Sequence, residues 1–122
     1  MLSTNEAQQL LDIANVGCTK GYILEARAIY EALVTLNPVQ ISACIGLAFS
    51  HIVSNEFAEG ERVLREKVLA THPHDEEAGI MLGLCQILAG NKAVAQEILE
   101  PLAQAKGNRA ELARTLLEQA RE

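Results

Sequence analysis

Residues 10–30 read LLDIANVGCTKGYILEARAIY, and five landmarks in this stretch recur twice further along the chain. Each landmark returns in kind after 34 residues and again after a further 35. The five series are Ile13/Leu47/Leu82, Ala14/Ala48/Gly83, Gly21/Asn55/Gly90, Ala26/Gly60/Ala95 and Tyr30/Leu64/Leu99. Because all five share the same two intervals, the sequence predicts one structural unit repeated three times.

The second unit carries one extra residue. Leu64 still follows Tyr30 by 34 residues, whereas Pro73 follows Pro38 by 35. The insertion is therefore predicted between Leu64 and Ala78.

Composition indicates that the repeated unit is helical. Hydrophobic residues make up 49% of the chain and aromatic residues only 3%, and Ala, Leu, Ile, Glu and Gln, which favour helices, dominate. We expect an all-α fold, with helices at about 4–18, 22–36, 40–54, 56–71, 75–89, 92–105 and 108–121.

Signals at the predicted helix ends agree with these bounds. Ser3-x-x-Glu6 fits a capping box, and Asp75 can cap the fifth helix. Gly21 and Gly90 can take the left-handed conformation that ends a helix. Pro38 and Pro73 are predicted to lie in the turns between units. Pro101 is predicted to kink the sixth helix, and Asn108-x-x-Glu111 is predicted to begin the seventh.

The spacing and the small residues resemble the tetratricopeptide family, whose unit is a helix–turn–helix of about 34 residues. The matching residues are Leu10-x-x-Ile13-Ala14-x-x-Gly17, Ala26-x-x-x-Tyr30 and Pro38; Cys44-x-x-Leu47-Ala48-x-x-His51, Gly60-x-x-x-Leu64 and Pro73; and Gly79-x-x-Leu82-Gly83-x-x-Gln86, Ala95-x-x-x-Leu99 and Gly107. The large aromatic residues of the family's first helix are missing. The resemblance implies a single domain, 1–122, with a superhelix of three hairpins (about 7–38, 41–73 and 76–107) and a capping helix at 108–121.

In that family the first helix of each unit lines a concave face, through its second, fifth, ninth and twelfth positions. These positions hold Gln8, Leu11, Asn15 and Cys18; Ser42, Ile45, Phe49 and Ile52; and Glu77, Ile80, Leu84 and Ile87. Seven of the twelve are large and apolar, and basic residues that would clamp a peptide carboxylate are missing. An apolar groove open to water is an interaction surface. The predicted partner-binding residues are Leu11, Asn15, Ile45, Phe49, Ile52, Ile80, Leu84 and Ile87.

A second interpretation remains open, because apolar residues on a helix are usually core. A register shifted by one residue would move Ile45 and Phe49 inward. The charged residues of the second helices, such as the i, i+4 pair Glu61 and Arg65, are expected on a solvated outer face.

The composition argues against several functional classes. A formal net charge of −6 disfavours nucleic acid and anionic membranes as partners. Cys18, Cys44 and Cys85 lack CxxC spacing and are expected to be buried, reduced thiols in a cytoplasmic protein. His51 is expected to be structural, and His72 and His74 to be solvated turn residues. Without a recognisable catalytic motif, we expect no enzyme activity, no metal and no cofactor.

A narrower resemblance concerns residues 21–38, GYILEARAIYEALVTLNP, followed by Ile45-Gly-Leu-Ala-Phe49. These stretches are similar to the first repeats of bacterial type III secretion chaperones. The resemblance implies a protein partner, either a needle subunit bound through an apolar amphipathic helix or a translocator bound through an extended segment. It also implies a small helical co-chaperone as an additional partner. The short chain favours the needle type; a general adaptor in a cytosolic complex, or self-association, remains an alternative.

Overall fold

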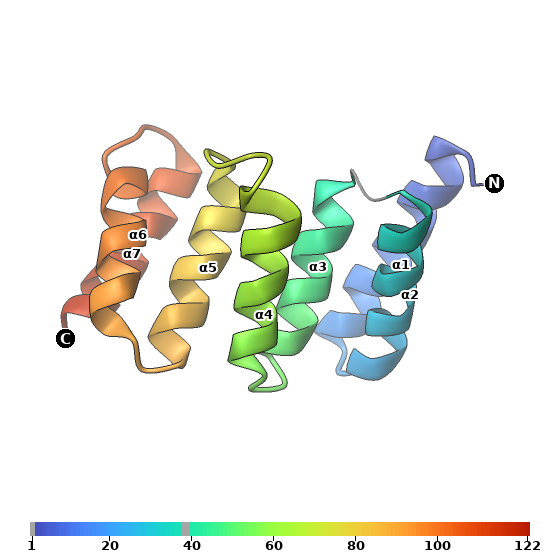
Figure 1. The fold of residues 1–122 in the computed structure, drawn as a ribbon, viewed down its shortest axis with the longest axis horizontal. Coiled ribbons are helices and arrows are strands. Elements are labelled where there is room, and N and C mark those ends of the chain that lie inside the picture. The colour runs from blue at the N-terminus through green and yellow to red at the C-terminus, as the bar shows by residue number, and fades with distance from the viewer. Residues whose placement is uncertain (1, 38–39) are drawn as a thin grey trace.

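The computed structural model describes residues 2–37 and 40–122, and in this part of the chain every regular element is helical. The elements form a row from the N-terminus to the C-terminus (Figure 1). In chain order they are α1 (Thr4–Thr19), α2 (Ile23–Leu36), α3 (Ile41–Ile52), α4 (Phe57–Val63), the π-helical η1 (Leu64–Leu69), α5 (Glu76–Leu88), α6 (Lys92–Ala103) and α7 (Asn108–Arg121). The all-helical prediction is thus confirmed for the described residues.

The turn inside each hairpin is built in the same way three times. Gly21, Asn55 and Gly90 have positive φ angles of 92°, 62° and 87°. In each turn the next residue donates its backbone N–H to the carbonyl five positions earlier, at 2.8 Å: Tyr22 to Gly17, Glu56 to His51 and Asn91 to Gln86. This bond closes a Schellman-type helix end, which favours glycine or asparagine. The series Gly21/Asn55/Gly90 therefore recurs because one backbone geometry recurs.

Small residues lie where the two helices of a hairpin approach each other. A Cβ atom added at Gly60 would come within 2.8 Å of Ile52 Cγ1 and 3.3 Å of the Ala48 carbonyl oxygen. At Gly83 it would come within 2.6 Å of Leu99 Cγ. A larger side chain at these positions would push the helices apart, because interiors are close-packed.

The extra residue of the second unit is absorbed by η1. The sequence predicted one α-helix over about 56–71, but the structure has α4 followed by a π-helical segment. After Tyr30 the next residues on the buried side come three and four positions later, at Leu33 and Val34. After Leu99 they come at the same two distances, at the half-buried Leu102 and the buried Ala103. After Leu64 they come four and five residues later, at the buried Val68 and the half-buried Leu69. A π turn takes one residue more than an α turn, so these side chains still reach the core.

The remaining end signals can be compared residue by residue. The Ser3 capping box and the Asp75 cap are both formed. Pro73 lies in the turn before α5, and Pro101 lies inside the last turn of α6. Helix α7 follows Gly107, which has a φ of 107°, and its N-terminus has no side-chain cap. Pro38 lies outside the described residues.

Neighbouring hairpins stack through both of their helices. Helix α1 packs on α3 and α3 on α5, while α2 packs on α3 and α4 on α5. The buried side chains form one large cluster that runs from α1 into α5, and a smaller cluster shared by α5, α6 and α7. Helix α7 thus covers the C-terminal end of the row. Among the described residues, the helices are all too short or too polar to cross a membrane.

Candidate functional site

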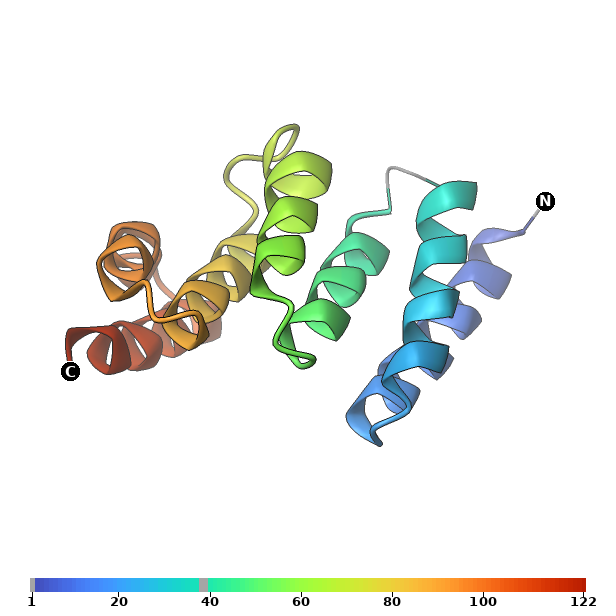
Figure 2. The same cartoon turned by 60° about the horizontal axis from the view of Figure 1, so that its bottom comes forward.

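Helices α1, α3 and α5 lie side by side and form one long surface, which we call the inner face. Figure 2 shows α2, α4 and α6 on the other side of the row. The inner face is made by the first helix of each hairpin, the helix to which the resemblance assigns the binding surface. Helix α4 and η1 carry surface ion pairs, such as the one that joins Arg65 and Glu61 at 2.7 Å.

A hollow of about 300 Å³ opens on the inner face. It runs obliquely, from the last turns of α1 across the middle of α3 to the first turns of α5. Its lining residues are Asn15, Cys18 and Thr19 of α1, Tyr30 of α2, Gly46 and Phe49 of α3, and Glu77 and Met81 of α5. Three successive units thus contribute to one depression.

The floor of the hollow depends on Gly46 and Tyr30. The Tyr30 ring is buried, and a Cβ atom at Gly46 would lie 2.6 Å from its Cζ atom. The Tyr30 hydroxyl donates a hydrogen bond of 2.6 Å to Asn15 Oδ1. Burial raises the pKa of Tyr30 to about 12, so the phenol stays protonated and remains a donor at neutral pH. The floor is thus a fixed aromatic surface with one polar edge.

The eight predicted groove residues divide into three groups. Leu11, Ile45, Ile52 and Ile80 are buried, with at most 8% of their surface exposed, so they hold neighbouring helices together. Phe49, Leu84 and Ile87 are half-buried, and Asn15 is exposed. Only Asn15 and Phe49, both at the ninth position of a unit, line the hollow.

The sequence reasoning missed Gly46 and Met81, which line the hollow at the sixth position of their units. The fifth position turns between the helices, whereas residues at the sixth and ninth positions line the hollow. Residues three apart lie on the same face of a helix, so the spacing alone could have grouped the sixth position with the ninth.

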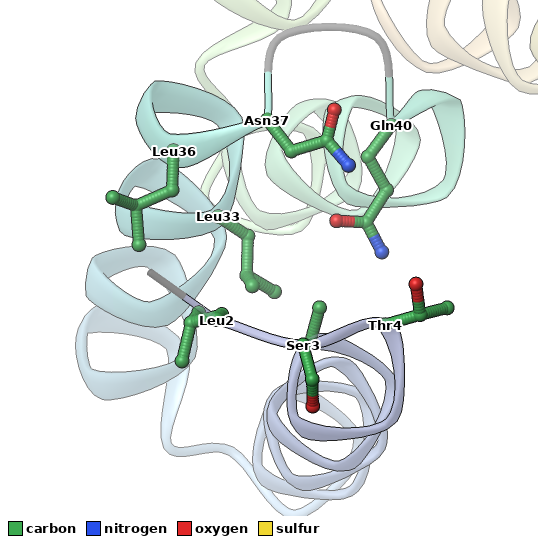
Figure 3. Close-up of a pocket in the computed structure, with 8 residues that line it drawn as sticks. Leu2, Ser3, Thr4, Leu33, Leu36, Asn37 and Gln40 are labelled. Carbon is green, nitrogen blue, oxygen red and sulfur yellow. The ribbon is translucent and has the colours of Figure 1, made fainter.

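A second hollow, of about 240 Å³, lies at the N-terminal end of the row (Figure 3). Leu2, Leu33 and Leu36 supply its apolar part, and the side chains of Asn37 and Gln40 lie at its upper edge. Gln40 Oε1 is buried and has no hydrogen-bond partner among the described residues. This hollow involves only the first hairpin and the start of α3, so it is separate from the inner face.

A polar cluster joins the first two hairpins. Arg27 of α2 donates to the Ser50 hydroxyl at 3.1 Å, to the Ser50 carbonyl at 2.8 Å and to Glu56 Oε1 at 2.8 Å. His51 Nδ1 lies 3.1 Å from the same Glu56 oxygen. Hydrogen bonding from His51, followed by the charge of Arg27, lowers the pKa of the Glu56 carboxyl. His51 therefore has a structural setting.

The other candidate chemical groups are dispersed. Cys18, Cys44 and Cys85 are buried thiols, as predicted, and burial raises their pKa values. Within residues 2–37 and 40–122, His, Cys, Asp and Glu side chains form no group of three that could hold a metal ion. The turn residues His72 and His74 are exposed.

Comparison with models of known protein families gives no match to this chain, and comparison with curated proteins gives none either. The resemblance to tetratricopeptide proteins is therefore carried by the residues of this chain alone.

Proposed function

We propose that this protein is a tetratricopeptide-type superhelix that binds an apolar helix of a partner protein on its inner face and shields it from water. The hollow lined by three successive units carries this proposal. Phe49 and Met81 give it apolar contact area, and Asn15, Thr19 and Glu77 give it a polar rim. Protein interfaces commonly have this arrangement of an apolar centre and a polar edge.

The proposed cargo is a subunit of a type III secretion apparatus, with the needle subunit first and a translocator as the alternative. The support is the similarity of residues 21–38 and 45–49 to chaperones of that system. A needle subunit polymerises through an apolar stripe, and covering about 800 Å² of it would keep the subunit monomeric. The protein would act in the bacterial cytoplasm and would need neither cofactor nor catalysis.

The exposed apolar side of α1 supports a second partner, the small helical co-chaperone. Ile13 and Val16 of α1 are 58% and 54% exposed. Their equivalents in the later units, Leu47 and Ser50, and Leu82 and Cys85, are at most 6% exposed because the preceding hairpin covers them. A helix of another protein could cover Ile13 and Val16 in the same way.

The direct test is affinity purification from the cytoplasm of the native organism with matched variants. Phe49→Glu should abolish recovery of the cargo, since it places a charge in the centre of the proposed interface. Leu24→Glu is the control, because Leu24 is 72% exposed on α2, away from the hollow. Circular dichroism should show equal helical content for both variants.

The adaptor alternative predicts a different set of proteins. If the co-purifying proteins belong to a stable cytosolic complex and include no secreted subunit, the chaperone proposal fails while the binding surface stands. Equal recovery of cargo by Phe49→Glu and Leu24→Glu would instead reject the inner face as the binding site.

A further inference from the structure

The basic residues of this protein are distributed unevenly over its helices. All ten lysines and arginines lie outside α1, α3 and α5, in the outer helices, α7 and the turns. The three inner helices contain four acidic residues instead: Glu6, Asp12, Glu76 and Glu77. The proposed binding surface therefore combines an apolar centre with a negative charge of its own.

One of these carboxylates lines the hollow, and another lies on α1 three residues before the lining residue Asn15. Glu77 lines the hollow directly, and Asp12 holds the same position in the first unit that Gly46 and Met81 hold in the second and third. Both side chains are exposed. Asp12 accepts a hydrogen bond from Gln8 Nε2 at 2.9 Å, a neutral group that leaves its charge in place.

Two cations lie at the ends of this surface, and a third, Arg27 of α2, bonds to Ser50 of α3 but is paired with Glu56. Lys20 follows the last turn of α1, and Arg109 of α7 lies 3.7 Å from Glu77. The Arg109 and Glu77 side chains are 59% and 51% exposed, and such surface pairs contribute little to stability because water and salt screen them. Glu77 can therefore exchange Arg109 for a cation of a bound chain.

We propose that the inner face selects an amphipathic helix whose apolar stripe is flanked by lysine or arginine. This inference rests on the proposed function and specifies the chemistry of its partner. The apolar stripe would lie over Phe49 and Met81, and a flanking cation would face Glu77 at one end and Asp12 at the other. An acidic helix of equal hydrophobicity would meet like charges there, and like charges across an interface suppress the wrong partner.

The test uses two synthetic helical peptides with the same leucine and alanine stripe, one bearing lysine and the other glutamate on the remaining positions. Three full-length proteins are compared: the native chain, an inner variant with Asp12→Asn and Glu77→Gln, and an outer variant with Glu25→Gln and Glu31→Gln. Glu25 and Glu31 are exposed on α2. Each variant loses two carboxylates, so the inner and outer variants have equal net charge. Dissociation constants come from fluorescence anisotropy at low and high salt.

The native protein should bind the lysine peptide about tenfold more tightly than the glutamate peptide at low salt. The inner variant should lose most of this preference, and the outer variant should keep it. Equal loss in both variants would overturn the inference, because net charge alone would then explain the preference. Equal binding of both peptides by the native protein would overturn it but leave the proposed function standing, whereas binding of neither would contradict the proposed function as well.

Discussion

At the scale of single residues, backbone geometry explains the sequence landmarks better than side-chain chemistry does. Gly21, Asn55 and Gly90 share a positive φ angle, and the left-handed region favours glycine and asparagine. This role was predictable from sequence at the two glycines. The floor of the hollow was not, because the contact between Gly46 and Tyr30 joins residues of different hairpins that no local pattern links.

Gly46 and Gly17 should respond in opposite ways to replacement by alanine. Gly46→Ala forces a methyl group into the Tyr30 ring and should destabilise the fold by about 1–3 kcal/mol. At Gly17 the new Cβ would meet the Cβ atoms of Tyr22 and Ala26 at 3.9 and 4.0 Å, an ordinary contact. Gly17→Ala should therefore stabilise the protein by about 0.5–1 kcal/mol through helix propensity. Urea denaturation measures both changes, and destabilisation by Gly17→Ala would contradict this packing.

Arg27 should matter more than other arginines, because its side chain is only 14% exposed and bonds to α3 and the following turn. Arg27→Met should cost about 2 kcal/mol, since charge-assisted hydrogen bonds are lost and Ser50 stays buried. Arg62 is the control. It pairs with Glu59 and Glu66 on the surface, where solvent screens the charges, so Arg62→Met should change stability much less than Arg27→Met. Equal thermal shifts for the two variants would show that the cluster does not join the hairpins.

At the scale of elements, the sequence predicted the helices and the extra residue but not the form the insertion takes. The intervals place it after Leu64, yet an insertion can lengthen a turn or widen a helix. The helix is widened here because only a π turn brings Val68 and Leu69 round to the side that packs on the core. That choice depends on packing against α3 and α5, which no interval reveals.

Deletion of one residue provides a test of η1. Removing Glu66, an exposed residue of η1, should restore a regular α-helix and leave cooperative unfolding in place, with only a small change in Tm. Removing Ala32, an exposed residue of α2, should move Leu33 and Val34 off the buried side and abolish cooperative unfolding. Thermal melts followed by circular dichroism compare the two proteins. Loss of folding in both would mean that η1 is required for the second hairpin rather than tolerated by it.

At the scale of the whole molecule, stacking converts a sequence repeat into a continuous inner face. Each hairpin leaves one apolar side uncovered, and the next hairpin covers it. Of the eight residues that the sequence predicted for binding, two line the hollow and four are buried between helices. Leu11, Ile45 and Ile80 share the fifth position and are buried, because that position turns toward the neighbouring hairpin. Only packing between units separates it from the sixth and ninth positions, which supply Gly46, Met81, Asn15 and Phe49 to the lining of the hollow.

The central claim is that a guest helix lies on the inner face across α1, α3 and α5. Hydrogen–deuterium exchange of the full-length protein, with and without its purified cargo, tests this most directly. We expect cargo to slow exchange in the last turns of α1, around Phe49 in α3 and in the first turns of α5, while α2 and α4 stay unchanged. Protection confined to the outer helices, or spread evenly over the chain, would contradict the account.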